Sequence, residues 1–251
     1  MIQHPQPHHI PQLKTLWKSA FGDSDAFLDA FFTCAFALDR CLCLTEGDTP
    51  IAAAYWLPGT CAEAPVAYLY AITTAQTHRN QGHFHRLMKA IHETLKIQGY
   101  AGSLLVPAQE SLFGLYGSLG YAPCCPMEVL QAEAGEKAVA LTVCTAEAYR
   151  RHRAPMAPEG EFAPGEEMWR LLEKDCFFAI GRNFCLCGIL EGDTLYAQEF
   201  LGDRAVLPGI LKALNVSKGV CKKSGTKLPR AMFFPLQEGA AAPNYLGFPL
   251  E

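Results

Sequence analysis

The hydrophobic positions near the N-terminus change from helical to strand-like spacing. The segment 11–21 places its apolar residues three and four positions apart behind a proline, which predicts a helix. The segment 24–32 repeats this spacing, with Ser24 or Asp23 as its N-cap. Residues 41–59 instead form two apolar runs joined by the polar turn EGDTP, which predicts a β-hairpin.

A strand, a helix, a second strand and a short helix are expected next. Residues 66–75 are rich in aromatic and β-branched side chains and predict a strand. The following helix has an apolar stripe from Phe84 to Leu95. Residues 103–108 predict a second strand, and 112–119 a short helix. This order predicts a mixed α/β layer with two parallel strands around a crossover helix.

The amino-acid composition of the chain changes after this region. Residues 132–137 and 154–167 are rich in Pro, Gly and Glu, which is typical of a linker or long loop. Both halves contain CLC followed by EGDT, a weak internal repeat at two hairpin turns. We therefore expect two domains, residues 1–135 and 136–251. The second domain is expected to contain a helix, a hairpin, another helix and a terminal pair of strands, the first three at 166–174, 176–202 and 205–215.

Composition limits the classes of partner. Half of the 251 residues are hydrophobic and 18% are charged, which favours a packed core over disorder. The 21 basic and 25 acidic side chains give a net charge of −4. This balance argues against a nucleic-acid partner and against attachment to a membrane through a basic patch. It remains compatible with cationic small molecules.

The eleven cysteines do not predict a disulfide framework. Their number is odd, and the pairs Cys41/Cys43 and Cys185/Cys187 occupy alternating positions of predicted strands, where we expect buried thiols. The sequence contains no C-x-x-C, and His83-x-His85 is too short a pattern to indicate a metal site. It also contains no secretory leader pattern and no apolar run of about 18 residues. We therefore expect a reduced, cytoplasmic protein without a metal.

The turn THRNQG, between the strand 66–75 and the following helix, is the most informative segment. A tight turn that leads directly into a helix gathers backbone N–H groups, and the helix dipole adds positive potential there. Arg79 supplies a cation suited to a phosphate group. An ordinary strand–turn–helix connection would have the same outline, so this segment alone leaves both interpretations open.

A second segment carries a family resemblance. The turn RNQG at 79–82 is followed, about thirty residues later, by a strand and then LYGSLGY at 115–121. This arrangement resembles the GCN5-related N-acetyltransferase (GNAT) family. THRNQGHFHRLM together with LYGSLGY looks closest to Eis-type acetyltransferases, which carry a second GNAT-like domain. The resemblance covers roughly the first 125 residues well and the second half in outline.

The resemblance implies a GNAT fold followed by a smaller GNAT-like domain. It also implies an acetyl-CoA-dependent N-acetyltransferase that acts, by direct attack, on a primary amine of a small molecule or peptide. Strand backbone groups would hold the pantetheine arm, and N–H groups of the turn would hold the pyrophosphate. The cofactor-binding residues implied in this way are Ile72, Thr73, Thr74, Arg79, Asn80, Gln81, Gly82, His83, Phe84 and Ser111.

Tyr116 matches the family tyrosine that protonates the departing thiolate. Unperturbed tyrosine and thiol pKa values of about 10 and 8.5 are compatible with this proton transfer. The general base stays open between Glu110, His85 and the terminal carboxylate of Glu251, which Eis-type enzymes place at the active site. The family turn prefers a small residue where this chain has Phe84, so we expect a somewhat reshaped cofactor site.

The sequence is also compatible with two other functions. A non-catalytic acyl-CoA-binding or regulatory module would keep the same fold. A nucleotide-binding α/β protein is disfavoured because the sequence contains neither G-x-x-x-x-G-K-[ST] nor G-x-G-x-x-G. A homo-oligomer is compatible with all three interpretations.

Overall fold

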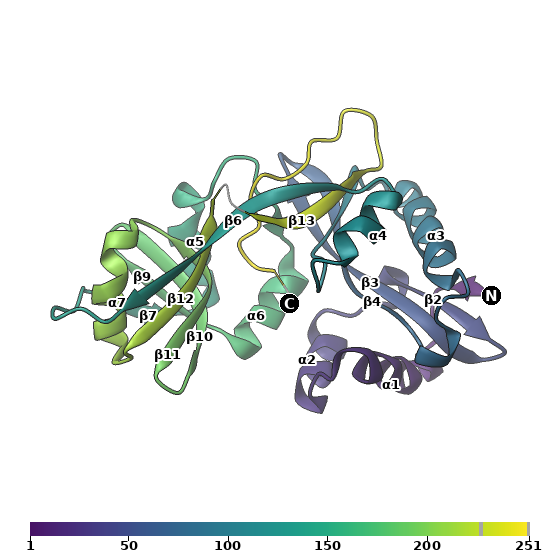
Figure 1. Cartoon of the computed structure of the whole chain (residues 1–251), viewed down its shortest axis with the longest axis horizontal. Coiled ribbons are helices and arrows are strands. Elements are labelled where there is room, and N and C mark those ends of the chain that lie inside the picture. Colours follow the sequence, from purple (N-terminus) through teal and green to yellow (C-terminus); the bar gives the residue numbers. More distant parts are fainter. Residues whose placement is uncertain (226–227, 250–251) are drawn as a thin grey trace.

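The computed structural model describes residues 1–225 and 228–249, which form two lobes around one continuous mixed sheet (Figure 1). The first lobe contains β1 (Ile2–Gln3), α1 (Ile10–Phe21), α2 (Asp25–Cys34), β2 (Cys41–Glu46), β3 (Thr49–Cys61), β4 (Ala64–Thr74), α3 (His83–Ile97), β5 (Gly102–Leu105), α4 (Leu112–Ser118) and β6 (Ala122–Glu133). The later elements are β7 (Thr142–Cys144), α5 (Ala146–Arg153), β8 (Ala163–Pro164), α6 (Glu166–Asp175), β9 (Phe177–Gly181), β10 (Phe184–Glu191), β11 (Thr194–Leu201), α7 (Leu207–Leu214), β12 (Lys218–Ser224) and β13 (Leu228–Pro235).

The mixed α/β architecture predicted from the sequence is confirmed. The hairpins β2–β3 and β10–β11 form where expected, and β4 and β5 are parallel neighbours connected through α3. Ser24 caps α2, because its side chain accepts a hydrogen bond from the Phe27 N–H at 3.1 Å. These elements therefore follow from local sequence patterns.

Strand β13 is where the observed topology departs from the sequence prediction. We expected a terminal pair of strands, but β12 and β13 each pair with β6 instead of with each other. Strand β13 lies between β5 and β6, with Phe233 opposite both Leu104 and Ala122. A segment from the end of the chain thus completes the sheet of the first lobe. The division at residues 135 and 136 remains a proposal, with β13 as an excursion across it.

Three smaller elements also differ from the prediction. Helix α5 lies between the two stretches interpreted as linkers and was not predicted, because it is highly polar. Strand β8 forms within the expected loop 154–167 and pairs with β3. Strand β5 ends at Leu105 and not at Ala108, because Pro107 lacks the N–H that a continuing ladder needs.

The two lobes share a hydrophobic core on one face of the sheet. Trp17 of α1 and Tyr55 of β3 lie in the same buried cluster as Trp169 of α6 and Phe178 of β9. Helix α3 covers the opposite face of the first lobe, where the predicted stripe is buried from Leu87 to Leu95 and Phe84 is half-buried. The shared cluster fixes the two lobes relative to each other through apolar burial.

A buried charge network holds the second lobe together. Glu199 is fully buried in β11 and accepts hydrogen bonds from the hydroxyls of Tyr149 and Tyr245, at 2.7 and 3.0 Å. The Arg153 Nε donates to the same carboxylate at 2.7 Å, and its guanidinium also pairs with Glu161. Each of these buried polar groups has a hydrogen-bond partner. Because Tyr149 and Arg153 belong to α5 and Tyr245 follows β13, their shared contacts with Glu199 connect these two segments.

The predicted strand cysteines are buried as expected. Cys41, Cys43, Cys185 and Cys187 are all fully buried, and the cysteines of the described residues are free thiols. Within residues 1–225 and 228–249, no helix has the length and apolar character needed to cross a bilayer.

Candidate active site

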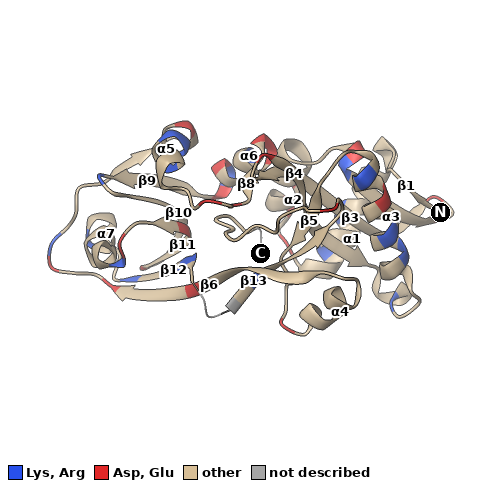
Figure 2. Ribbon diagram, turned by 90° about the horizontal axis from the view of Figure 1, so that it is seen from above, with Lys and Arg blue, Asp and Glu red and all other residues tan. Residues whose placement is uncertain are grey.

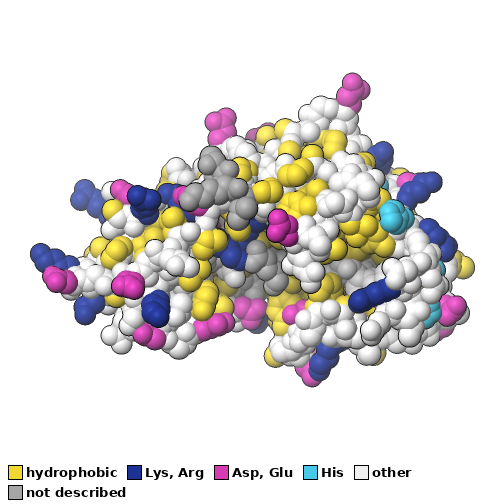
Figure 3. Space-filling view, in the orientation of Figure 1, with side chains coloured by type: hydrophobic (Ala, Val, Ile, Leu, Met, Phe, Trp, Pro, Cys, Tyr) yellow, Lys and Arg dark blue, Asp and Glu magenta, His cyan; other side chains and the backbone are white. Residues whose placement is uncertain are grey.

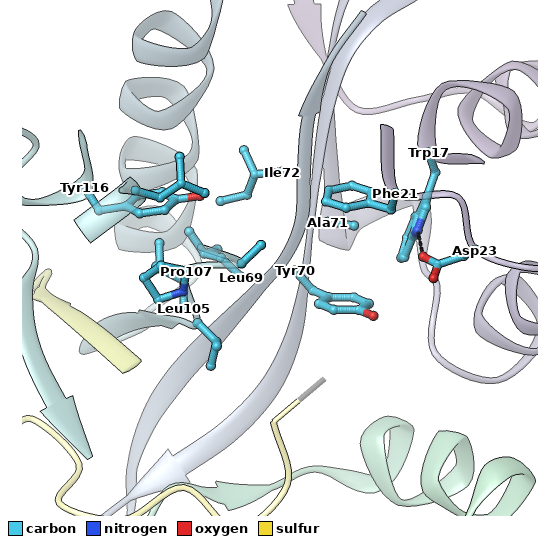
Figure 4. A pocket seen from close by; sticks show the side chains of 13 residues that line it. Trp17, Phe21, Asp23, Leu69, Tyr70, Ala71, Ile72, Leu105, Pro107 and Tyr116 are labelled. Carbon is cyan, nitrogen blue, oxygen red and sulfur yellow. Dashed lines mark hydrogen bonds between the residues drawn. The ribbon is translucent and has the colours of Figure 1, made fainter. Parts of the chain in front are cut away.

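The paired strands β4 and β5 separate, and a cavity of about 550 Å³ lies at this point (Figure 4). Their parallel register ends at Leu69 opposite Leu105, whereas β4 continues to Thr74. Beyond Leu105 the chain passes through Pro107 toward α4. The cavity is lined by Trp17, Phe21, Asp23, Leu69, Tyr70, Ala71, Ile72, Leu105, Val106, Pro107, Ala108, Leu112 and Tyr116. Hydrophobic side chains gather around the hollow between α4 and the α1–α2 pair (Figure 3).

A bulge in β4 forms one wall of this cavity. Tyr70 pairs with Tyr55 and Thr73 with Ala53, so Ala71 and Ile72 have no paired residue of their own on β3. Ala71 adopts a left-handed backbone conformation, with φ of +48°. Such a bulge interrupts the strand ladder and redirects backbone groups. It therefore places backbone groups of Ala71 and Ile72, outside the regular register, at the cavity.

The turn that follows β4 opens directly onto the N-terminus of α3. Asn80 and Gly82 are both left-handed, with φ of +61° and +74°, and the Arg79 Nε donates to the Thr74 carbonyl at 3.2 Å. Gly82 is the N-cap and has no side chain to accept from the first N–H groups of α3. These donors and the helix dipole together make the turn suited to an anion such as a phosphate.

Tyr116 reaches the cavity from α4. Its side chain is buried, and its hydroxyl is directed toward Ile72 across the cavity (Figure 4). Burial raises the pKa of Tyr116 to about 12, so the hydroxyl keeps its proton over the physiological range. The side chain is thus available as a proton donor inside the cavity.

Phe84 supports Tyr116 from α3. The two rings meet edge to face with centroids 5.7 Å apart, and the Tyr121 ring contacts Tyr116 from another side at 5.9 Å. The bulky residue at this position of the turn therefore packs toward α4. It helps to hold the proposed proton donor in place.

The remaining predicted residues lie at different depths. Thr73 is buried with no hydrogen-bond partner for its Oγ1, whereas Ser111 is exposed at the N-cap of α4. Thr74 ends β4, Gln81 lies in the turn and His83 begins α3, and none of the three lines the cavity. Glu110 and His85 are exposed and also lie outside the cavity lining. Glu251 lies outside the described residues.

Several residues on the opposite wall were not singled out as site residues by the sequence analysis. Asp23 lines the cavity together with Trp17, Phe21 and Tyr70, and its Oδ2 accepts a hydrogen bond from the Trp17 Nε1 at 2.7 Å. Asp23 and Ser24 were equivalent N-cap candidates in the sequence. Because Ser24 takes that role, the Asp23 carboxylate is left to face the cavity.

One group of side chains in the described part of the chain has the spacing of metal ligands. His8 and His9 lie next to Asp48, with each Nε2 about 3 Å from an Oδ atom. The Nδ1 of buried His9 accepts the Gln6 N–H at 3.0 Å, so its Nε2 carries the proton that it donates to Asp48. These contacts fasten the N-terminal segment to the β2–β3 turn. The pair His83 and His85 forms no such group.

Comparisons with known proteins agree with this geometry. A family profile described as an acetyltransferase (GNAT) domain matches residues 1–124. No curated protein matches the chain in sequence. The fold is similar to a GCN5-related N-acetyltransferase from Kribbella flavida, with a TM-score of 0.72, 16% identity and coverage of 94% of this chain and 72% of that one.

The two-lobed arrangement also has counterparts among solved structures. Eis1 from Mycobacterium abscessus aligns with a TM-score of 0.67 and 13% identity, over 94% of this chain and 74% of that one. A GCN5-related N-acetyltransferase from Anabaena variabilis aligns with a TM-score of 0.71 and 14% identity, over 94% and 73%. At these identities the likeness concerns the fold. The family profile, in contrast, matches in sequence, so residues 1–124 of this chain belong to the GNAT acetyltransferase family.

Proposed function

We propose that the protein is an acetyl-CoA-dependent N-acetyltransferase that acts on a primary amine. The observation that carries this proposal is the convergence of three features on one cavity. These are the separation of β4 from β5, the bulge at Ala71 and Ile72, and the buried hydroxyl of Tyr116. Each feature meets a requirement of acyl transfer from a thioester.

The residues present fit acetyl-CoA. The left-handed turn at Gly82 leaves open space, because no atom lies within 4 Å of a Cβ built there. The backbone N–H groups of His83 and Phe84 would bind the pyrophosphate, with Arg79 as a nearby cation. The β4 backbone from Ile72 to Thr74 would hold the pantetheine arm, and Ser111 would contact the same molecule. Acetyl-CoA supplies the activated acetyl group.

Two residues of the cavity, Ile72 and Tyr116, would then take different roles in the transfer of the acetyl group. The Ile72 N–H would donate to the carbonyl oxygen as negative charge develops there. The Tyr116 hydroxyl would donate its proton to the departing sulfur, and the surrounding apolar wall would exclude water. With the pKa of Tyr116 raised to about 12, the hydroxyl is still protonated when the sulfur begins to depart.

The opposite wall supports binding of the acceptor in its ammonium form, which must lose a proton to become the attacking amine. A carboxylate beside aromatic rings is a favourable site for an organic cation, through ion pairing and cation–π contact. Asp23 provides the carboxylate, with Trp17 and Tyr70 as its aromatic neighbours. Lys and Arg are interspersed with Asp and Glu on the helices of both lobes (Figure 2), so the charge pattern favours a small acceptor over nucleic acid.

Release of free thiol from acetyl-CoA in the presence of a panel of amines tests this function. We expect acetyl-CoA to raise the melting temperature and amines to trigger thiol release. Absence of both signals would overturn the proposal. A thermal shift without thiol release for any amine would favour the non-catalytic acyl-CoA-binding module instead.

A further inference from the structure

A second cavity adjoins the proposed acceptor wall at Tyr70. It measures about 130 Å³ and lies between the lobes. Tyr70 lines both this cavity and the larger one, so its ring forms a shared partition. In Figure 4 the ring projects from β4 with its hydroxyl end on the side of Asp23. The second cavity is lined by Phe27, Tyr70, Leu171, Leu172, Asp175, Cys176, Ile189, Gln198 and Pro249.

Among the described residues, Asp175 is the one carboxylate in the lining of this second cavity. At the start of α6, Glu166 pairs with Arg150 and Glu167 pairs with Arg40. Asp175, at the end of the same helix, has no hydrogen-bond or ion-pair partner among residues 1–225 and 228–249. Partial burial raises its pKa, as expected for a carboxylate that lacks a cation beside it. No cation of the described residues therefore balances its charge, which makes the carboxylate suited to a cationic ligand.

Besides burial, the carboxylates of Asp23 and Asp175 both raise the pKa of the Tyr70 hydroxyl. The pKa of Tyr70 is raised, first by burial, then by Tyr68, and then by the negative charges of Asp23 and Asp175. Tyr70 thus lies within electrostatic reach of one carboxylate from each cavity. Its ring offers an aromatic surface between them, and Phe27 and Leu171 continue that apolar surface.

Building on the proposed function, we propose that the acceptor is a diamine or polyamine whose second ammonium group binds Asp175. The amine that reacts would lie in the larger cavity, between the β4 bulge and Asp23. The alkyl chain would pass along the Tyr70 ring and place the far ammonium group in the smaller cavity. A monoamine would leave Asp175 without a partner. Asp175 is therefore a specificity-determining residue supplied by the second lobe.

Steady-state acetylation of matched amines tests this specificity. Cadaverine and n-pentylamine share one chain length and differ in the second ammonium group. We expect wild-type protein to favour cadaverine in kcat/KM by about tenfold, the usual contribution of a charged hydrogen bond. Asp175→Asn should reduce this preference to within about twofold. Glu173→Gln, on an exposed position of α6, is the matched control and should keep the full preference.

Alkylation of Cys176 gives a readout that does not depend on turnover. Cys176 lines the same cavity, and a hydrogen bond from Cys187 lowers the pKa of its thiol, which favours reaction with iodoacetamide. Cadaverine should slow alkylation of Cys176 in wild-type protein but not in Asp175→Asn, as measured by peptide mass spectrometry. Cys34, which does not line this cavity, should react at an unchanged rate in both.

The outcomes separate this inference from the proposed function. Equal kcat/KM for cadaverine and n-pentylamine in wild-type protein, without protection of Cys176, would overturn the assignment of Asp175 and leave the acetyltransferase intact. No acetylation of any amine, with Cys176 still protected by cadaverine, would overturn the proposed function and retain the diamine site.

Discussion

The imidazole of His92 stacks on the ring of Phe234, with centroids 4.2 Å apart and ring planes 12° from parallel. His92 belongs to α3 and Phe234 to β13, so the stack joins the crossover helix of the first lobe to a strand from the end of the chain. The His92 Nε2 also lies 2.8 Å from the Tyr121 hydroxyl, which in turn contacts the Ser103 Oγ at 2.7 Å. This junction holds α3 against the inserted strand.

The buried position of His92 predicts that the folded protein becomes less stable at acidic pH. Burial, and then the charge of Lys96, lowers the pKa of His92 to about 4, against about 6.5 in the unfolded chain. Between these pH values the unfolded chain binds a proton that the folded chain does not. The free energy of unfolding should therefore fall by up to about 3 kcal/mol as pH drops from about 6.5 to about 4, and this contribution should be constant above that window.

Urea denaturation at several pH values measures this effect. His92→Gln should flatten the dependence in this window, whereas His85→Gln, at an exposed position of the same helix, should retain it. An unchanged slope in His92→Gln would mean that other groups cause the acid sensitivity.

Tyr116→Phe should lower kcat by about a hundredfold, the usual effect of losing a general acid. The KM for acetyl-CoA should change little, because the ring and its contact with Phe84 remain. Tyr196→Phe, on the exposed surface of β11, serves as the control. Because the pKa of Tyr116 is raised to about 12, we expect no loss of its acid role up to about pH 11. A wild-type rate in Tyr116→Phe would exclude the proton-donor role.

Gly82→Ala should weaken acetyl-CoA binding and cost about 1 kcal/mol of stability, because an alanine is strained at φ of +74°. Gly22→Ala is a matched control, since Gly22 has φ of +77°, equally open surroundings and a place at the end of α1. Both variants should lose similar stability by thermal denaturation. Only Gly82→Ala should raise the KM for acetyl-CoA, and equal KM values would remove the turn from the cofactor site.

Asp23→Asn should lower kcat/KM for amines about tenfold, since it removes the charge but keeps an acceptor for the Trp17 Nε1. The KM for acetyl-CoA should stay the same. Asp25→Asn, two positions further along in an exposed pair with Lys18, is the control and should behave as wild type. Equal kcat/KM in all three proteins would place the acceptor elsewhere.

Glu199→Gln should lower the free energy of unfolding by about 3 kcal/mol, because the buried Arg153 loses one of its two carboxylates. Glu191→Gln, on the exposed end of β10, should have a small effect. The midpoints of urea denaturation give the comparison. Similar midpoints for the two variants would show that Glu161 alone balances the Arg153 charge.

Local sequence signals were sufficient for the elements that form the proposed cofactor side of the site. The stripe on α3, the cap at Ser24 and the hairpin turns depend on neighbours within a few positions, and each formed where expected. The motif residues Gly82 and Tyr116 were likewise recognisable, because they belong to short patterns with fixed spacing.

Features that depend on distant pairing could not be predicted from the sequence. The segment around Phe233 has the apolar pattern of a strand. Its neighbours in the sequence do not specify that it pairs with Leu104, which lies more than a hundred residues earlier. The bulge at Ala71 gave no signal, because its left-handed residue is not a glycine. Asp23 was an N-cap candidate, and Asp175, directly after the predicted helix 166–174, belongs to no motif. Only the packing of the lobes brings these two carboxylates to either side of Tyr70.

The position of β13 has a consequence for biosynthesis. The family domain at residues 1–124 leaves the ribosome without the strand that separates β5 from β6. The β5 edge, including Leu104, stays unpaired on that side until residues beyond Phe233 have emerged. Because an open strand edge readily pairs with other chains, the nascent protein is most vulnerable to misassembly during the translation of its second lobe.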